Sequence, residues 1–188
     1  GQGIREMANL TGEQRRVLLR ELDRLEQTVD VLLLDTGAGI SENVLRFTTF
    51  ADEVLVVTTP NLAATTDAYS ITKVILEMEP NAKIGLLVNM ADDMYTAKTV
   101  FHRVNTATER HLEYKLGDLG YIVRDTHMEE ATRRRQPLVT LFPDSPSAQC
   151  LRAVCQTLLE GKIFVNDQKP SAFGDLMGSL KRSMVGAA

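Results

Sequence analysis

Residues 29–39 have the sequence VDVLLLDTGAG, in which an apolar run ends at an aspartate and two glycines. The run from Val29 to Leu34 does not alternate between apolar and polar residues. An unbroken apolar run is typical of a parallel strand that is covered on both faces. The stretch therefore predicts a buried parallel strand at residues 29–34.

The same combination of apolar strand and periodic helix recurs along the chain. Thr11 and Gln14 form a capping box before a predicted helix at 12–27. Strands alternating with helices favour right-handed crossovers and a mostly parallel sheet. The fold class that we predict is therefore α/β, a doubly wound sheet with helices on both faces. The further predicted elements are strands at 53–58, 83–89 and 119–123, and helices near 42–50, 64–78, 94–113, 127–135 and 145–160.

Size and composition agree with one folded domain and a small appendage. The chain has 188 residues, of which 44% are hydrophobic and 24% charged, and its formal net charge is −4. Such a balance excludes a disordered or collagen-like chain, and it gives no support to non-specific nucleic-acid binding. Two cysteines, Cys150 and Cys155, are too few for a disulfide framework and fit a reducing cytosol. We expect cytoplasmic localisation.

Polar or glycine-rich residues follow each of four predicted strands. They are Asp35 to Gly39, Thr58 to Pro60, Asn89 to Met90 and Val123 to Asp125. Ligands of open α/β sheets bind beyond the carboxyl ends of the strands, so these residues are the candidate site.

Asp35 has two interpretations that its spacing leaves equally open. A carboxylate at a strand end can hold Mg²⁺, while the N–H groups of Gly37 and Gly39 face phosphate oxygens. Alternatively, Asp35 caps the next helix and the glycines only form a tight turn.

Residues 29–40 resemble the Walker B strand and switch II of the MinD/ParA ATPases. The segment from Ala51 to Pro60, with Thr66 to Tyr69 and Ile71 to Lys73, is similar to the flagellar-number regulators of that family. The resemblance covers about residues 1–160.

The resemblance implies ATP and Mg²⁺ as cofactors and gives each matching residue a role. Asp35 would orient water on the metal, and Gly37 and Gly39 would lie at the γ-phosphate, which Gly39 senses. Asn89 would bind the adenine edge. The turn that lies beside the base would be formed by Val123, Arg124 and Asp125. Val123 stands where the family usually has proline.

For the intact protein, the resemblance implies a nucleotide-dependent switch that forms a homodimer with ATP. The implied partners are the GTPase of flagellar placement and flagellar switch or regulatory proteins, with reversible membrane association. Relatives of the ParA type bind DNA, but the net charge is −4 and the arginines at 133–135 follow two glutamates on a predicted solvated helix face. We therefore expect no role for nucleic acid.

One element of the family is missing from these 188 residues. No G-x-x-x-x-G-K-[ST] loop occurs in them, and only 34 residues precede Asp35. Without this cradle, the charge on the transferring phosphoryl group is not stabilised. We therefore expect an ATPase parent, but no ATP hydrolysis by residues 1–188 alone.

The last residues form a separate pattern. After the ATPase portion at 1–160, residues 161–171 have a linker composition, and 172–188 form a predicted amphipathic tail. Its apolar side is formed by Phe173, Leu176, Met177 and Leu180. Such a helix either lies at a membrane surface, here the inner face of the cell membrane, or docks on the core as an ordinary helix.

Two further function classes remain as alternatives. One is a non-catalytic α/β protein-interaction scaffold that binds no nucleotide. The other is a phospho-accepting receiver domain, because Asp35 and Thr58 follow successive strands, but the acidic pair and the lysine that such domains need are not present.

Overall fold

The computed structural model describes residues 28–36 and 51–161, together with positions 20, 21, 24, 25, 45 and 48. Contacts divide the chain into two compact units, Gly1–Phe50 and Ala51–Ala188. The second unit contains every regular strand of the described residues.

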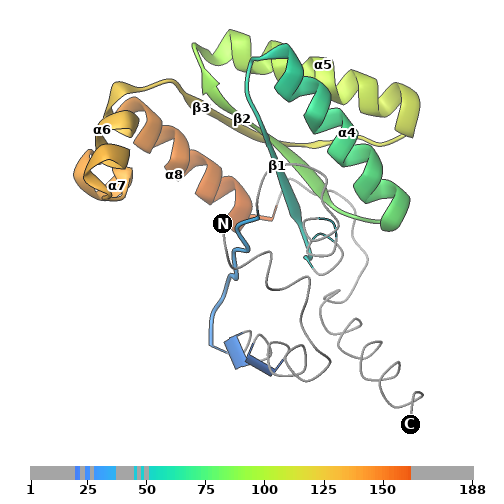
Figure 1. Ribbon diagram of the computed structural model, residues 1–188, viewed down its shortest axis with the longest axis horizontal. Coiled ribbons are helices and arrows are strands. Elements are labelled where there is room, and N and C mark those ends of the chain that lie inside the picture. Colours follow the sequence, from blue (N-terminus) through green and yellow to red (C-terminus); the bar gives the residue numbers. More distant parts are fainter. Residues whose placement is uncertain are drawn as a thin grey trace. The chain divides into compact units, whose positions relative to one another are not determined.

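The second unit is built on a three-stranded parallel sheet in the order β1-β2-β3 (Figure 1). Strand β1 (Val54–Thr58) pairs with β2 (Ile84–Ala91) in an uninterrupted register from Val54↔Ile84 to Thr58↔Val88. Strand β3 (Gly117–Val123) pairs with the other edge of β2, and its register shifts twice. The central strand β2 is buried at six of its eight residues, as expected for a strand covered on both faces.

Helices cover both faces of this sheet (Figure 1). Helices α4 (Leu62–Met78) and α5 (Met94–Leu112) pack side by side, and Ala97 and Val100 of α5 contact Val88 of β2. On the opposite face, Val154 of α8 (Pro146–Leu159) packs against Leu87 of β2 together with two residues of β3, Leu119 and Ile122. This unit is therefore an α/β/α sandwich.

Two short helices connect β3 to α8. They are α6 (Thr126–Arg134) and α7 (Leu138–Leu141), and they pack against α8 through Ala131, Leu138 and Ala148. Four helices begin at a residue whose side chain accepts a hydrogen bond from a backbone N–H of the first turn. These caps are Asn61, Asp93, Asp125 and Ser145.

The predicted fold class and most of the predicted elements are confirmed. The strands at 53–58, 83–89 and 119–123 and the four helices after residue 60 occur within about two residues of the expected bounds. Helix α7 was not predicted, because four residues behind Pro137 are too few to show a helical period.

The predicted strand at 29–34 is wrong. Residues 31–36 have no regular secondary structure, and Val31 and Leu33 are 64% and 77% exposed. An apolar run becomes a parallel strand only where a neighbouring strand takes up its N–H and C=O groups. The sheet of the described residues consists of β1, β2 and β3, and residues 29–34 are not paired with any of these strands.

Several predictions lie wholly or mostly outside the described residues. The described positions of the helices at 12–27 and 42–50 are helical at 20, 21, 24, 25, 45 and 48. The linker, apart from Gly161, and the tail at 172–188 are not described. Over the residues that are described, no helix is long and apolar enough to cross a membrane.

Gly85 provides a test of the packing between β2 and β3. A Cβ atom at this position would lie 2.8 Å from both Cγ and Cδ1 of Leu119, closer than two carbon atoms can approach. Because Leu119 is only 1% exposed, its side chain has little room to move.

Gly85→Ala should therefore lower the free energy of unfolding by about 1–3 kcal/mol, measured by urea denaturation. In a Leu119→Ala background, the same substitution should cost less, because the overlapping atoms are gone. Equal costs in both backgrounds would show that the contact is not the cause.

Candidate functional site

The candidate site is the edge of the sheet at which the three parallel strands end. Thr58 ends β1, Asn89 lies near the end of β2, and Val123 ends β3. Val123 pairs with Ala91, so the ends of β2 and β3 are neighbours in the ladder. The structure thus brings together the strand ends that the sequence singled out at Asn89 and at Val123 to Asp125.

Asn89 lies where the pairing between β2 and β3 shifts its register. Its Oδ1 accepts a hydrogen bond of 2.9 Å from the backbone N–H of Met90. Met90 has φ 57°, which is rare for a residue other than glycine and is typical of strained functional turns. This contact fixes the Asn89 amide and leaves its Nδ2 as the group that can donate to a ligand.

Arg124 links the end of β3 to the loop after β2. Its backbone N–H donates to the carbonyl of Ala91 at 2.8 Å, and its Nε lies 3.5 Å from Oδ1 of Asp92. Both side chains are more than 60% exposed, so the ion pair adds little stability. The backbone bond is the firmer of the two links.

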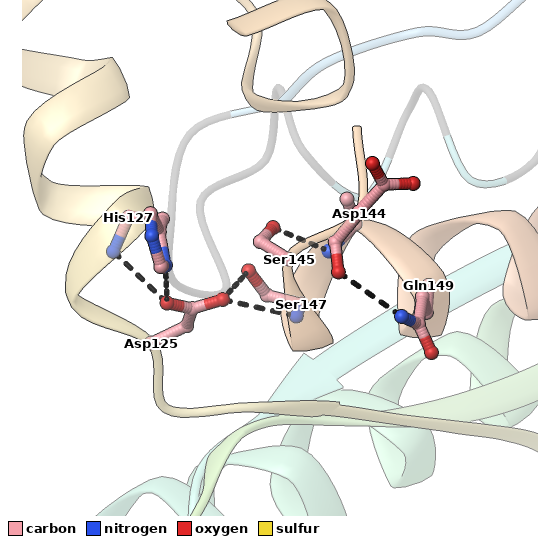
Figure 2. A network of polar contacts seen from close by, with 7 residues as sticks. Asp125, His127, Asp144, Ser145, Ser147 and Gln149 are labelled. Carbon is pink, nitrogen blue, oxygen red and sulfur yellow. Dashed lines mark hydrogen bonds and ion pairs between the residues drawn. The ribbon is translucent and has the colours of Figure 1, made fainter. Parts of the chain in front are cut away.

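Asp125 is the best-connected polar residue of this edge (Figure 2). Its side chain is only 5% exposed. Its Oδ1 accepts from the backbone N–H of His127 at 2.9 Å and lies 2.8 Å from His127 Nδ1. Its Oδ2 accepts from the hydroxyl of Ser147 at 2.8 Å and from the backbone N–H of Ser147 at 3.1 Å. One carboxylate therefore binds the first turns of both α6 and α8.

These contacts determine the ionisation of Asp125. Burial opposes the charged form and acts to raise the pKa, but the hydrogen bonds from His127 and Ser147 together outweigh it. They hold the pKa of Asp125 well below its ordinary value of 3.8. Asp125 is consequently a carboxylate at neutral pH, as suits a group placed at two helix N-termini.

The residues Asp125, His127 and Ser147 are the types found in nucleophilic catalytic triads, but their geometry excludes that role. Ser147 is fully buried and donates its proton to the carboxylate, whereas a nucleophilic serine would donate to the imidazole. The ring of His127 packs instead against Phe142, with centroids 4.7 Å apart. The cluster is therefore a structural connection between helices.

A shallow surface cavity lies beside this cluster. Its volume is about 540 Å³, and it is lined by Thr126, His127, Glu129, Glu130, Arg133 and Phe142. Glu130 forms ion pairs with Arg133 and Arg134. The arginines at 133–134 are thus part of an exposed helix face, on which Glu130 offsets part of their charge.

Two neighbouring aspartates follow β2. Asp93 caps α5 by accepting from the backbone N–H of Thr96 at 2.7 Å, and this bond is the main cause that lowers the pKa of Asp93. Asp92 pairs with Arg124. Within the described ranges, no group of three His, Cys, Asp or Glu side chains is arranged to hold a metal ion.

The remaining predicted site residues either belong to the first unit or lie outside the described residues. Asp35 is exposed and belongs to a segment without regular secondary structure. Gly37, Gly39 and the tail residues Phe173, Leu176, Met177 and Leu180 lie outside the described residues. Their roles stay predictions.

Sequence reasoning missed Ser147, which completes the Asp125 cluster. The signal was partly visible, since Ser145-Pro146 marks the start of a helix. It did not show that this helix begins beside the end of β3, because Asp125 and Ser147 are 22 residues apart.

Comparison with known proteins identifies the family. A model of the ParA family, described as NUBPL iron-transfer P-loop NTPase, matches residues 16–159. The chain belongs to the ParA family of P-loop NTPases.

Several relatives of this ParA-family chain have names that refer to flagella or to septum placement. It is 29% identical over 154 residues to the antiactivator FleN of Pseudomonas aeruginosa, which covers 82% of this chain and 55% of FleN. It is 26% identical over 133 residues to the flagellum site-determining protein YlxH of Helicobacter pylori, covering 70% of this chain and 45% of YlxH.

Solved structures of MinD share the fold. The cell division protein MinD of Aquifex aeolicus matches with a TM-score of 0.59 at 18% identity, over 80% of this chain and 60% of that one. MinD of Pyrococcus horikoshii, solved with Mg-ADP, matches with a TM-score of 0.60 at 20% identity, over 81% and 62% of the two chains. The ParA-family chain thus spans about half the length of its curated relatives and about three fifths of these structures.

The bonds of Asp125 predict how stability depends on pH. Asp125→Asn should lower the free energy of unfolding by about 2 kcal/mol near pH 7, because asparagine has a single acceptor oxygen for two helix N-termini. Since the pKa of Asp125 is depressed on folding, this stabilisation is complete above about pH 4 and is lost as the pH falls further. The difference between the two proteins should therefore shrink in acid.

Urea denaturation at several pH values between about 3 and 7 measures this difference. Asp118→Asn is the matched control, because the only bond of Asp118 within the described part of the chain is the one it accepts from the nearby N–H of Gly120. A loss from Asp125→Asn that is the same at both ends of the pH range would contradict the charged role.

Proposed function

We propose that the chain is the base-recognition portion of a MinD/ParA-type ATPase that regulates flagellar number or placement. The observation that carries this proposal is the juxtaposition of Asn89 with the turn from Val123 to Asp125, at the carboxyl edge of a parallel sheet in a ParA-family chain. The similarity to YlxH, whose name refers to determining the flagellum site, supports the flagellar branch.

The residues at this edge fit a purine base. Asn89 can donate from Nδ2 to a ring nitrogen, because its Oδ1 already accepts from Met90. The backbone from Val123 to Arg124 supplies the neighbouring wall, and the bond from Arg124 to Ala91 fixes its distance from β2. With Val123 in place of the family proline, the wall keeps an apolar side chain beside the base.

Residues that could bind the phosphates, in contrast to those that fit the base, are missing from the described strand ends. No Walker A loop occurs in the 188 residues, and the described strand ends carry no lysine or glycine-rich turn that could replace it. We therefore assign the phosphate cradle to a part of the protein outside residues 1–188, and ATP hydrolysis to the whole protein. Asp35, with Gly37 and Gly39, would complete the Mg²⁺ and γ-phosphate site there.

In the whole protein, ATP would close two subunits face to face, and hydrolysis would release them. The amphipathic tail would bind a membrane weakly as a single copy and more strongly as two copies in a dimer, by effective concentration. Flagellar placement and switch proteins are the partners that this assembly would recruit.

Calorimetric titration with ATP and Mg²⁺ tests the division of the site. Residues 1–188 alone should bind ATP no more tightly than about 1 mM, because the base contacts act without the phosphate contacts. Micromolar binding by these residues would overturn the assignment of the phosphate cradle to another part.

The longer protein provides the positive arm of this test. The reading frame upstream of the codon for Gly1 should encode a Lys-Gly-Gly loop, and its product should bind ATP. Asn89→Ala should weaken that binding about tenfold, whereas Asn81→Ala, in the exposed turn before β2, should not. A start codon near Gly1 would favour the alternative function, a scaffold that binds no nucleotide.

A second test addresses the tail. Leu176→Glu should reduce co-sedimentation with anionic liposomes several-fold, because it places a charge on the predicted apolar side. Ser179→Glu changes the charge equally on the polar side and is the control. Unchanged binding after deletion of residues 172–188 would contradict a membrane role.

A further inference from the structure

The carboxylate of Asp125 faces the protein rather than the open edge of the sheet. Its Oδ1 accepts a hydrogen bond from His127, and its Oδ2 accepts one from Ser147 (Figure 2). The side chain is almost fully covered. Because four intrachain contacts occupy the carboxylate, little capacity remains for a ligand. This observation separates Asp125 from Asn89, whose Nδ2 donates to none of the residues that the structure describes.

The turn that contains Asp125 is held from two sides. On one side, the N–H of Arg124 donates to Ala91 of β2 at 2.8 Å. On the other, Asp125 binds the hydroxyl and backbone N–H of Ser147 in the first turn of α8. Hydrogen bonds thus connect the turn both to the central strand β2 and to the N-terminus of α8.

Helix α8 is itself a firm support. Ser147 and Ala148 are completely buried, and Ser145 caps the helix by accepting from the N–H of Ala148. Val154, farther along α8, packs into the sheet beside Leu119. A group bonded to the first turn of α8 is therefore fixed relative to the whole sheet.

We propose that Asp125 is a positioning residue of the nucleotide edge, which holds the Val123–Arg124 wall in place through Ser147 and does not itself contact the base. This inference rests on the proposed function, since that function gives the wall its ligand. The proposal makes Ser147 a determinant of nucleotide affinity, although Ser147 lies on α8 and is too deeply buried to contact a ligand.

Hydrogen exchange of residues 1–188 tests the first half of the proposal without any nucleotide. Ser147→Ala removes one hydroxyl bond from Asp125 and is small enough to leave α8 folded. The amides of Arg124 and His127 should then exchange about three- to tenfold faster, relative to the amide of Leu86 in β2, which reports global unfolding.

Asp118→Asn is the matched control, because Asp118 lies on β3 and, among the described residues, its carboxylate accepts a hydrogen bond only from the N–H of Gly120. It should leave the exchange of Arg124 unchanged. If Ser147→Ala also leaves Arg124 and His127 unchanged relative to Leu86, Asp125 does not hold the wall, and the proposal is overturned.

Nucleotide affinity of the longer protein tests the second half. Ser147→Ala should raise the dissociation constant for ATP at least about threefold, and Asp118→Asn should leave it unchanged. Faster exchange at Arg124 without weaker ATP binding would refute the positioning role. If the unsubstituted longer protein binds no ATP, the proposed function fails, while the exchange experiment still decides whether Asp125 holds the wall.

Discussion

The backbone hydrogen bonds of a parallel sheet are the constraint on which this structure depends. A parallel strand obtains its partners only from neighbouring strands, and each connection must cross a face of the sheet before the next strand begins. Helices α4 and α5 are such connections, and α5 and α8 cover opposite faces of β2. The same constraint places the ends of β1, β2 and β3 at one edge, so residues distant in sequence share a site.

Much of the fold could be predicted from the sequence, because local signals and tertiary contacts agree over residues 53–160. Apolar runs marked the strands, and periodic segments marked the helices, including the two that Asp93 and Ser145 cap in the structure. The prediction failed at residues 29–34, where the local pattern is equally apolar. Burial of such a run depends on a neighbour that no local pattern can reveal, and these side chains are exposed in the structure.

The candidate site was predictable in its position but not in its connections. The rule that ligands bind beyond strand ends led directly to Asn89 and to Val123–Asp125. It could not distinguish a side chain that faces a ligand from one that faces the protein. That distinction came from the contact between Asp125 and Ser147, which joins residues 22 positions apart and follows from the packing of α8 on the sheet.

The irregular pairing of β3 has a consequence for how the sheet can grow. Gly120 has φ 87°, and Asp118 accepts from its N–H, so the outer side of β3 carries a kink and a charge. Both features make a strand a poor template for a strand of another molecule. Strand β1 has neither: its five residues are uncharged and its register with β2 is unbroken. The described sheet therefore has one edge protected against aggregation and one suited to accept a further strand.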